Sequence, residues 1–441
     1  MKTKFTIIII LFFQINFSNA QQGNWYMGDL HAHSTHSDGK SSVTQVLKDA
    51  EQKGFQFFVI TDHDNIYTSQ QGTINTWTDT AYHSSSMILL YGVEWTTDNG
   101  HACIWNSAPF PYDSIYNANL LNDPKKTLMF TEQYNCLMSI NHPLNDFLTW
   151  NYGFDFDFKS MELLNGPYGY FLSKNDKVVE LWDSLLVAGR RINGVGGSDM
   201  HELNSFLPQV YPHLGSPSTH VYSSSATSEG ILDGLKKGHV VVSNSTTEPF
   251  LEFAADTNND NNIDIMMGDN MVSTSNNVNF QLKFIGAGTN YSVDIIKNGE
   301  VYKQLSISES NNENEFSDQV LSQTYYRAVL KNSSGNPVAW TNPIYFGYQE
   351  QNGVAVSANQ NIIENSINIY PNPAKEQLNV EVSENSYIQM FDLNGRQVIA
   401  EYTAIANQKQ TIGLSGLSNG VYFVKIYNDK LIKIIKVVVA K

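Results

Sequence analysis

Apolar positions divide the chain into two regions. Between residues 25 and 245, short apolar runs that suit strands alternate with segments whose apolar residues recur at helical spacing. The expected strands are Trp25–Leu30, Phe55–Thr61, Met87–Trp95, Cys136–Ile140, Ser160–Leu164 and Ile192–Gly196. The expected helices are Ser42–Lys53, Pro124–Tyr134 and Asn175–Gly189. This alternation predicts an α/β domain over residues 21–247 with a parallel sheet, most economically closed into a barrel.

The helical spacing stops after residue 247. Expected strands at Val278–Phe284, Tyr291–Ile296 and Tyr325–Leu330, with a hairpin turn at Lys297–Asn298–Gly299, predict an antiparallel β-sandwich over residues 248–348. Residues 349–366 have the polar composition of a linker. Residues 367–441 are expected to form a small all-β module.

The first 20 residues have the pattern of a secretory signal peptide. A basic start at Lys2 and Lys4 precedes the apolar run Phe5–Phe13 and the small-residue cleavage pattern Ser18–Asn19–Ala20. A membrane anchor is the alternative, but the run is shorter than the ~20 residues of a membrane span. We therefore expect a mature chain without a membrane span, beginning near Gln21.

Charge and cysteine content narrow the classes of function. The net charge of −16 argues against nucleic acid as a partner, because such binding depends on clustered Lys and Arg. Only Cys103 and Cys136 are present, so the chain is not a disulfide scaffold; they form either one bridge or two buried thiols.

Histidines mark the first region as the one that carries the chemistry. All eleven lie between His31 and His239, and the expected strands there end in potential metal ligands. Two of these ends have an alternating pattern, His31–Ala32–His33 and Asp199–Met200–His201, which places both side chains on one face of a strand. The other ends carry His63, Glu94 with His101 just beyond, and His142.

Parallel strands bring such ends to one rim of a barrel, so ligands far apart in the sequence can converge. Imidazole and carboxylate ligands without thiolate suit zinc, manganese or iron rather than calcium.

The potential ligands lie in six motifs, at residues 28–39 (GDLHAHSTHSDG), 60–64 (ITDHD), 92–96 (GVEWT), 100–105 (GHACIW), 140–143 (INHP) and 196–201 (GGSDMH). In order and spacing, these motifs resemble those of the polymerase and histidinol phosphatase (PHP) superfamily, particularly its stand-alone phosphoesterases. The resemblance covers residues 24–245. It implies a distorted (β/α)7 TIM-like barrel with two or three divalent metal ions.

The resemblance also implies a ligand set. One ion is held by His31, His33, Glu94 and Asp199; a second shares Glu94 and adds His101 and His142; a third uses Asp38, His63 and His201. Asp38 stands where some family members have histidine, which puts the third site in doubt. Asp62 is similar to a family carboxylate that orients the ring of His63.

Other polar residues have weaker claims. His36 either donates a proton to a leaving group or is an exposed loop residue, and the second is favoured. His83 is expected at the surface, and His213, His220 and His239 are weak candidates for the pocket mouth. Arg190 and Arg191 are the only arginines between residues 21 and 245, so metals must supply most of the positive charge for an anionic substrate.

The segment 256–264 is similar to a calcium loop. Asp256, Asn258, Asp260 and Asp264 occupy alternate ligand positions, but Met267 stands where such a loop has an acid and Asn261 where it has glycine. An Asx-rich turn is therefore favoured over weak calcium binding.

The C-terminal module resembles the sorting domain of the type IX secretion system, on residues 368–382 (NIYPNPAKEQLNVEV), 390–400 (MFDLNGRQVIA), 416–426 (GLSNGVYFVKI) and 430–436 (KLIKIIK). The alternative is a small adhesive domain. The resemblance implies that the type IX secretion machinery of a Bacteroidetes-type bacterium exports the chain, through the periplasm, to the cell surface or the medium.

Together these patterns predict a secreted metal-dependent phosphoesterase in which a metal-bridging hydroxide attacks a small phosphorylated substrate, with catalytic roles for Glu94, His36 and Asp62. Two alternatives stay open: hydrolysis of an amide, carbamate or carboxylic ester at the same centre, and an inactive surface binding protein. The ligand set is the same for both electrophiles, so the sequence does not separate phosphodiester from phosphomonoester or from these.

Overall fold

A computed structural model describes residues 23–64, 76–111, 122–169, 173–203, 212–272, 277–286, 290–307, 313–320, 322–348, 367–391, 397–428 and 432–441. The expected signal peptide (1–20) and linker (349–366) lie outside the described residues. None of the described helices is both long and apolar enough to cross a membrane.

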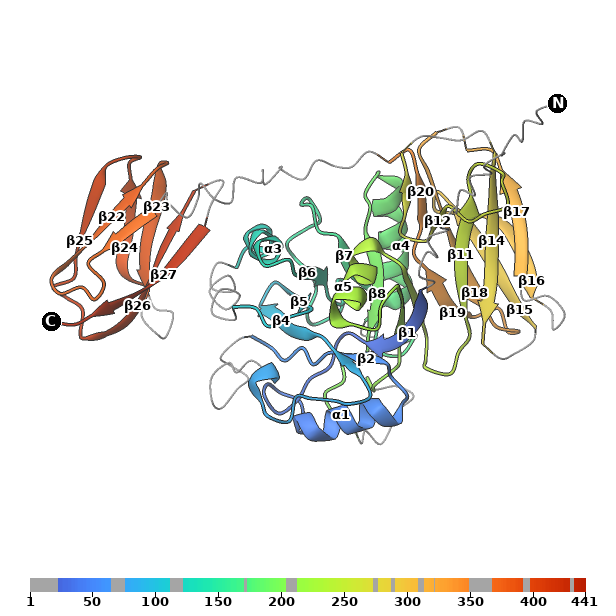
Figure 1. Ribbon diagram of the computed structural model, residues 1–441, viewed down its shortest axis with the longest axis horizontal. Helices are drawn as coiled ribbons and strands as arrows, with labels where there is room; N and C mark the ends of the chain where they lie inside the picture. Colours follow the sequence, from blue (N-terminus) through green and yellow to red (C-terminus); the bar gives the residue numbers. More distant parts are fainter. Residues whose placement is uncertain are drawn as a thin grey trace, which may run out of the picture.

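The first strands form the parallel part of a large sheet (Figure 1). β1 (Asn24–Asp29) pairs in parallel with β2 (Phe57–Phe58), which pairs in parallel with β3 (Ile88–Leu89). On the other side of β1, β9 (Ser218–Ser223) runs antiparallel and is followed by β10 (Val240–Ser243). His31 and His33 follow the C-terminal end of β1, and His63 follows that of β2, so the three histidines lie at the same edge of this sheet.

A second sheet has the order β4-β5-β6-β7-β8. Its strands are β4 (Tyr91–Thr97), β5 (Gly100–Asn106), β6 (Leu137–Ile140), β7 (Ser160–Asn165) and β8 (Asn193–Gly197). β6, β7 and β8 are parallel, but β4, β5 and β6 are antiparallel. The expectation of a purely parallel sheet is therefore wrong here, because the two-residue turn Asp98–Asn99 makes β4 and β5 a hairpin.

The two sheets meet beside the candidate ligands. Isolated parallel bridges join Ala32 to Met200 and His63 to Glu94. Among the described residues, strand pairing gives two sheets joined by these bridges, and the closed seven-stranded barrel is not confirmed.

Four described α-helices accompany these strands: α1 (Val43–Gln52), α3 (Pro124–Gln133), α4 (Asn175–Val187) and α5 (Ser228–Lys237), with a short 3-10 helix at Thr76–Thr78. α1, α3 and α4 confirm the three expected helices to within about two residues, the usual uncertainty of helix ends. α1 begins with a capping box between Ser42 and Gln45. α4 buries Val178, Trp182 and Leu186 in the core.

Residues 250–346 contain strands and their connections but no described helix. One sheet has the order β12 (Ile265–Met266), β11 (Phe250–Asp256), β14 (Val278–Ile285) and β17 (Glu313–Asp318). The other strands are β13 (Asn270–Met271), β15 (Tyr291–Lys297), β16 (Glu300–Ile307), β18 (Thr324–Lys331), β19 (Pro337–Thr341) and β20 (Ile344–Phe346). Side chains of both groups share one apolar core, and the expected hairpin at Asn298–Gly299 joins β15 to β16.

This strand-rich region is continuous with the first sheet. β19 pairs antiparallel with β10, so hydrogen-bonded strands run from β3 through β1 and β10 to β20. The Arg327 guanidinium forms a buried ion pair with Asp183 of α4, and Tyr325 donates a hydrogen bond of 2.9 Å to the same carboxylate. The strand-rich region therefore packs tightly on the α/β part of the chain.

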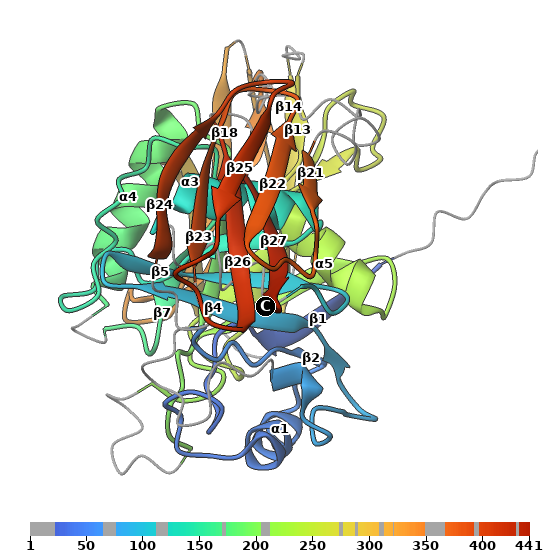
Figure 2. The ribbon, with the colours of Figure 1, turned by 90° about the vertical axis from the view of Figure 1, so that its left-hand side faces the viewer.

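The C-terminal residues form an all-β module of two sheets (Figure 2). One contains β21 (Ile367–Tyr370), β22 (Gln377–Val382) and β25 (Lys409–Gly413); the other contains β23 (Ser386–Phe391), β24 (Gln397–Ala404), β26 (Gly420–Tyr427) and β27 (Ile432–Val439). Alternate residues such as Leu378 and Val380 are buried between them. The expected all-β module is confirmed.

Candidate metal centre

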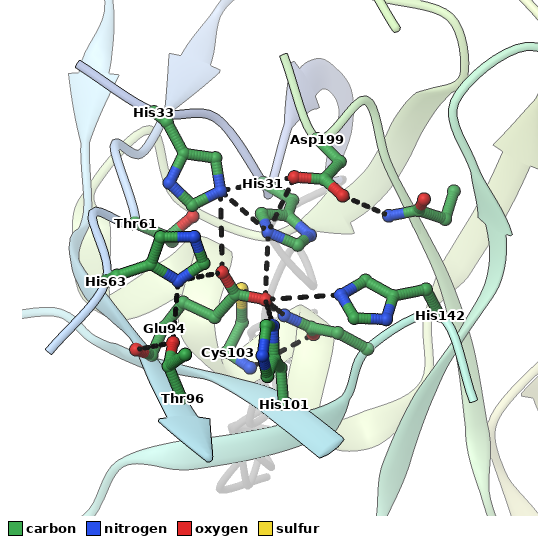
Figure 3. A network of polar contacts seen from close by, with 12 residues as sticks. His31, His33, Thr61, His63, Glu94, Thr96, His101, Cys103, His142 and Asp199 are labelled. Carbon is green, nitrogen blue, oxygen red and sulfur yellow. Dashed lines mark hydrogen bonds and ion pairs between the residues drawn. The ribbon is translucent and has the colours of Figure 1, made fainter. Parts of the chain in front are cut away.

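Six chain segments bring the expected ligands together. Figure 3 shows all of them except Asp38 and His201, which it does not label. His31 and His33 follow β1, His63 follows β2, Glu94 lies in β4 and His101 in β5. His142 follows β6, while Asp199 and His201 follow β8. Their donor atoms form three overlapping groups, and within each group the atoms lie within 4.8 Å of one another. The groups are His31, His33 and Asp199; His63, Glu94 and His101; and His33, Asp38, His63 and His201.

Glu94 lies at the middle of the cluster, with its side chain only 1% exposed. Figure 3 shows five imidazoles directed at its two oxygens. The nitrogens near Oε1 are those of His31 (3.3 Å), His101 (3.2 Å) and His142 (3.4 Å). Those near Oε2 belong to His63 (2.8 Å) and His33 (3.4 Å). This carboxylate therefore contacts residues of every proposed metal set.

Asp199 closes the deeper group. Its Oδ1 lies 3.4 Å from Nε2 of His31 and 3.2 Å from Nε2 of His33, and those two nitrogens are 3.2 Å apart. The Asp199 backbone is left-handed, with φ of 55°, and its N–H donates to the His31 carbonyl at 2.8 Å. The turn after β8 thereby directs the carboxylate back toward the imidazoles.

Asp38 forms the outer group. Its Oδ1 lies 3.2 Å from Nε2 of His201, 3.6 Å from Nε2 of His63 and 3.8 Å from Nδ1 of His33. The side chains of Asp38 and His201 are 41% and 36% exposed, whereas those of His31 and His33 are inaccessible. The outer group is therefore where a solute can reach the cluster.

The grouping differs in two respects from the sets implied by the resemblance. His63 faces Glu94 through Nδ1 and Asp38 through Nε2, so it lies between the second and third groups. His33 likewise links the first and third groups. All nine expected ligands gather at one place, but the geometry does not divide them into three separate sets.

The donors fit divalent cations. Burial opposes ionisation of Glu94, but the imidazoles of His31 and His63 hold its pKa well below the usual carboxyl range. Burial likewise lowers the pKa of His33 to about 4, with help from the nearby His201 and His63. The nearby imidazoles of His31 and His33 also hold the pKa of Asp199 well below the usual carboxyl range, against the effect of burial. The ionised carboxylates of Glu94 and Asp199 need compensating positive charge, and a divalent cation can supply it in place of protons on the rings. Nitrogen and oxygen donors of this kind suit zinc, manganese or iron.

The Glu162 carboxylate, which was not among the residues expected from the sequence, also contacts the cluster. Oε1 of Glu162 in β7 lies 2.7 Å from Nδ1 of His31, and Oε2 accepts hydrogen bonds from the His142 N–H (2.8 Å) and the Asn165 amide (3.2 Å). Its side chain is 1% exposed. The sequence feature that could have identified Glu162 is its place as the one acid in the otherwise apolar strand Met161–Leu164, because a buried acid needs a specific partner.

Glu162→Gln tests this support. The substitution keeps the size of the side chain but removes the charge that orients the His31 ring, so we expect metal affinity or turnover to fall ~10 to 100-fold. Metal titration and steady-state kinetics measure the two losses. The matched control is Glu180→Gln on the exposed face of α4, which should change neither.

The role expected for Asp62 is wrong. Its carboxylate does not orient His63; it accepts hydrogen bonds from the Ser34 N–H and hydroxyl and from the Ser37 and Thr76 hydroxyls, at 2.6–2.7 Å. Nδ1 of His63 instead lies 2.6 Å from the Thr96 hydroxyl. Asp62 therefore positions the loop between His33 and Asp38, because its carboxylate accepts the hydrogen bonds of the two serines in that loop.

His36 lies in that same loop and pairs with an acid. Its Nε2 is 2.9 Å from Oδ2 of Asp79, and its side chain is 17% exposed. His83 is exposed, as expected. His220 is buried and stacks on Phe250, with ring centroids 4.1 Å apart, and His239 pairs with Asp269. These two side chains are thus engaged elsewhere, and His213 joins none of the three donor groups.

Arginine contributes little positive charge to the cluster. The Arg190 guanidinium donates to the carbonyls of Phe154 and Phe156, and that of Arg191 donates to the Gly268 carbonyl. Both side chains therefore stabilise backbone segments. This is consistent with the expectation that metals provide most of the charge for binding an anion.

The structure shows the state of the two cysteines and the conformation of the 256–264 segment. Cys103 and Cys136 are free, buried thiols, and Cys103 lies in the apolar core below Glu94. The 256–264 segment forms an Asx-rich turn in which the Asp256 carboxylate accepts the backbone N–H groups of Asn258, Asn259 and Asn261.

Two family models match the chain. Residues 29–176 match the PHP domain, and residues 368–440 match the secretion system C-terminal sorting domain. No curated protein matches.

Two solved structures illustrate the similarity. A two-domain protein from Bacteroides vulgatus containing a predicted PHP-like metal-dependent phosphoesterase is 12% identical, with a TM-score of 0.39; the match covers 73% of this chain and 95% of that one. An amidohydrolase from Chromobacterium violaceum with bound sulfate and no metal is 14% identical, with a TM-score of 0.27, over 42% of this chain and 90% of that one. The chain therefore contains one segment that matches the PHP domain and another that matches the secretion system C-terminal sorting domain.

Proposed function

We propose that this protein is an exported, metal-dependent phosphoesterase. The observation that carries the proposal is the placement of Glu94, whose two oxygens face five imidazoles from four chain segments. One carboxylate in that position can hold two cations close together. Paired cations of this kind are suited to displacement at phosphorus.

Divalent ions bound here would lower the pKa of water toward ~7 and neutralise the charge that develops on a phosphoryl group. The chain's own residues hold and orient them: His31, His33 and Asp199 in the deep group, Glu94 and His101 in the middle, and Asp38 and His201 at the exposed edge. Glu162 keeps the His31 ring in place through Nδ1. A phosphoester would approach from the side of Asp38 and His201, because these two are the exposed members.

His36 is the proposed proton donor to the leaving group. Its ring lies in the loop between two of the proposed ligands, and its Nε2 lies 2.9 Å from Oδ2 of Asp79, which orients the ring. Solvent water can also protonate a leaving group at an exposed site, so we expect His36 to contribute less than the ligands do.

Export is proposed to follow from the last domain. The sorting-domain match supports delivery by the type IX secretion machinery to the cell surface or the medium, after a signal peptide at residues 1–20 has led the chain into the periplasm. The proposed domain limits are 21–247 for the hydrolase, 248–348 for the strand-rich region and 367–441 for the sorting domain.

The reaction is tested with metal-stripped and metal-restored protein. We expect two to three equivalents of transition metal in protein purified without chelator, loss of hydrolysis after chelation, and recovery with zinc, manganese or iron. The substrates are p-nitrophenyl phosphate, bis-p-nitrophenyl phosphate and p-nitrophenyl acetate. Hydrolysis of the acetate alone would redirect the proposal to carboxylic esters, and full activity in exhaustively stripped, metal-free protein would refute it.

A further inference from the structure

Strand β8 lies at the edge of its sheet, yet it is buried. Among the described strands, β7 is its one neighbour in that sheet, and all five residues from Asn193 to Gly197 are inaccessible or nearly so. The outward N–H and C=O groups of such a strand need partners, because an unpaired buried polar group costs ~1–3 kcal/mol.

Side chains replace the missing strand. The Gly194 N–H donates to Oδ1 of Asn342 at 2.7 Å, and Nδ2 of Asn342 donates to the Gly194 carbonyl at 3.2 Å. Two residues further, the Gly196 N–H donates to the Thr219 hydroxyl at 3.0 Å, and that hydroxyl donates to the Gly196 carbonyl at 2.8 Å. Each side chain thus makes the two hydrogen bonds that a neighbouring strand would make.

A third side chain, that of Asp29, binds the chain directly after β8, next to the cluster. Its Oδ1 accepts a hydrogen bond from the Ser198 N–H at 2.9 Å, and the N–H of the following residue, Asp199, donates to the His31 carbonyl. Asn342, Thr219 and Asp29, which we call the side-chain ladder, are at most 1% exposed. The ladder pairs residues 194, 196 and 198, so it fixes the outer edge of β8 up to Asp199.

We propose that Asn342 is a positioning residue for Asp199 and His201, and that the strand-rich region is thereby part of the metal centre. The proposal rests on the proposed function in treating these two residues as metal ligands. Asn342 lies between β19 and β20, in the Ala339–Tyr345 segment, and its own N–H donates to the Val240 carbonyl at 3.1 Å. The backbone of Asn342 is therefore bound to β10, while its side chain is bound to β8.

Asn342→Ala should disturb the centre from a distance. The substitution leaves the N–H and carbonyl of Gly194 buried without their partner, so β8 has to shift toward water or toward another donor. A misplacement of ~1 Å at reacting groups can cost ~100-fold in rate. We expect Mn²⁺ affinity at the cluster to weaken by about tenfold, at the lower end of the range for groups that orient ligands.

The experiment measures Mn²⁺ binding to the metal-stripped full-length chain by calorimetry, with hydrogen exchange of residues 193–201 and thermal melting alongside. Thr219→Val, which removes the next rung at nearly constant volume, should weaken Mn²⁺ binding similarly and covers the case in which Asn342→Ala does not fold. The matched control is Asp183→Asn, which weakens the buried pair with Arg327 at the same boundary without touching β8. It should lower the melting temperature but leave Mn²⁺ affinity within about twofold, since distant sites act independently.

Faster exchange at Gly194 with unchanged Mn²⁺ affinity in both ladder variants would overturn the proposal, because Asn342 would then be structural only. Equal weakening by Asp183→Asn at equal loss of melting temperature would overturn it as well. Mn²⁺ binding that follows the expected pattern in protein without phosphoesterase activity would support the positioning role and refute the proposed reaction.

Discussion

Glu94→Gln is expected to lower turnover by at least about a hundredfold and to reduce bound metal, since changes to groups that merely orient ligands already cost ~10 to 100-fold. Glutamine has nearly the same size, so the apolar surroundings of β4 stay filled. It removes the negative charge that both oxygens share among five imidazoles. It also replaces one oxygen by an amide nitrogen, which cannot serve as a ligand on that side.

Turnover and metal content of the same preparation measure this effect, with Glu180→Gln again as the control. His36→Ala is the informative comparison: it should keep the full metal content and lose less activity, because it removes a proposed proton donor and no ligand. Near-normal activity and metal in Glu94→Gln would show that Glu94 does not bridge cations, and the ligand assignment as a whole would have to be abandoned.

The convergence of the candidate ligands was predictable because their signal is local. A His or Asp directly after an apolar run is visible in one sequence, and the C-terminal ends of adjacent parallel strands necessarily meet. What the sequence could not supply was the second layer of contacts. Glu162, Thr96 and the serines around Asp62 depend on which loops cross in space. No spacing rule connects residues that lie 131 positions apart, as His31 and Glu162 do.

The fold was predictable where a pattern was long and regular. α1, α3 and α4 have clear caps or apolar faces, whereas α5 was missed because Gly230 and Gly234 lower helix propensity. Gly234 is there for close packing: an added Cβ would lie 2.6 Å from the Tyr222 carbonyl oxygen. The hairpin of β4 and β5 was missed as well, although the Asn99–Gly100 pair is a recognised turn signal.

Continuity between the α/β part and the strand-rich region was the least predictable feature. The composition changes at residue 248, which is why a domain boundary is expected there. In the structure β10 ends at Ser243 and its neighbour β19 arrives almost 100 residues later. Pairing over such a separation leaves no mark in the local pattern. A boundary in sequence character therefore need not be a boundary of folding.

Two truncated chains are expected to show whether the α/β part folds without the strand-rich region. A chain ending at Tyr348 keeps β19, β20 and Asn342, so it should bind metal and hydrolyse substrate like the full-length protein. It also keeps the hydrogen bond from the Tyr348 hydroxyl to the Leu186 carbonyl at 2.9 Å. In the cell it should fail to reach the surface, because the sorting domain is gone.

A chain ending at Thr247 should not fold into an active hydrolase at all. It loses the strand beside β10, the Arg327 partner of Asp183 and the Asn342 rung against β8. The apolar core of the α/β part also loses six buried side chains from the strand-rich region: Ile296, Tyr325, Val329, Trp340, Tyr345 and Tyr348. At ~2 kcal/mol for each buried side chain, this loss of ~12 kcal/mol is comparable to the whole stability of a typical domain, ~5–15 kcal/mol. Soluble yield, melting temperature and metal content compare the two chains. A Thr247-ended protein that melts cooperatively and binds metal normally would show that the hydrolase folds by itself, and surface delivery of the Tyr348-ended chain would show that the last domain does not direct export.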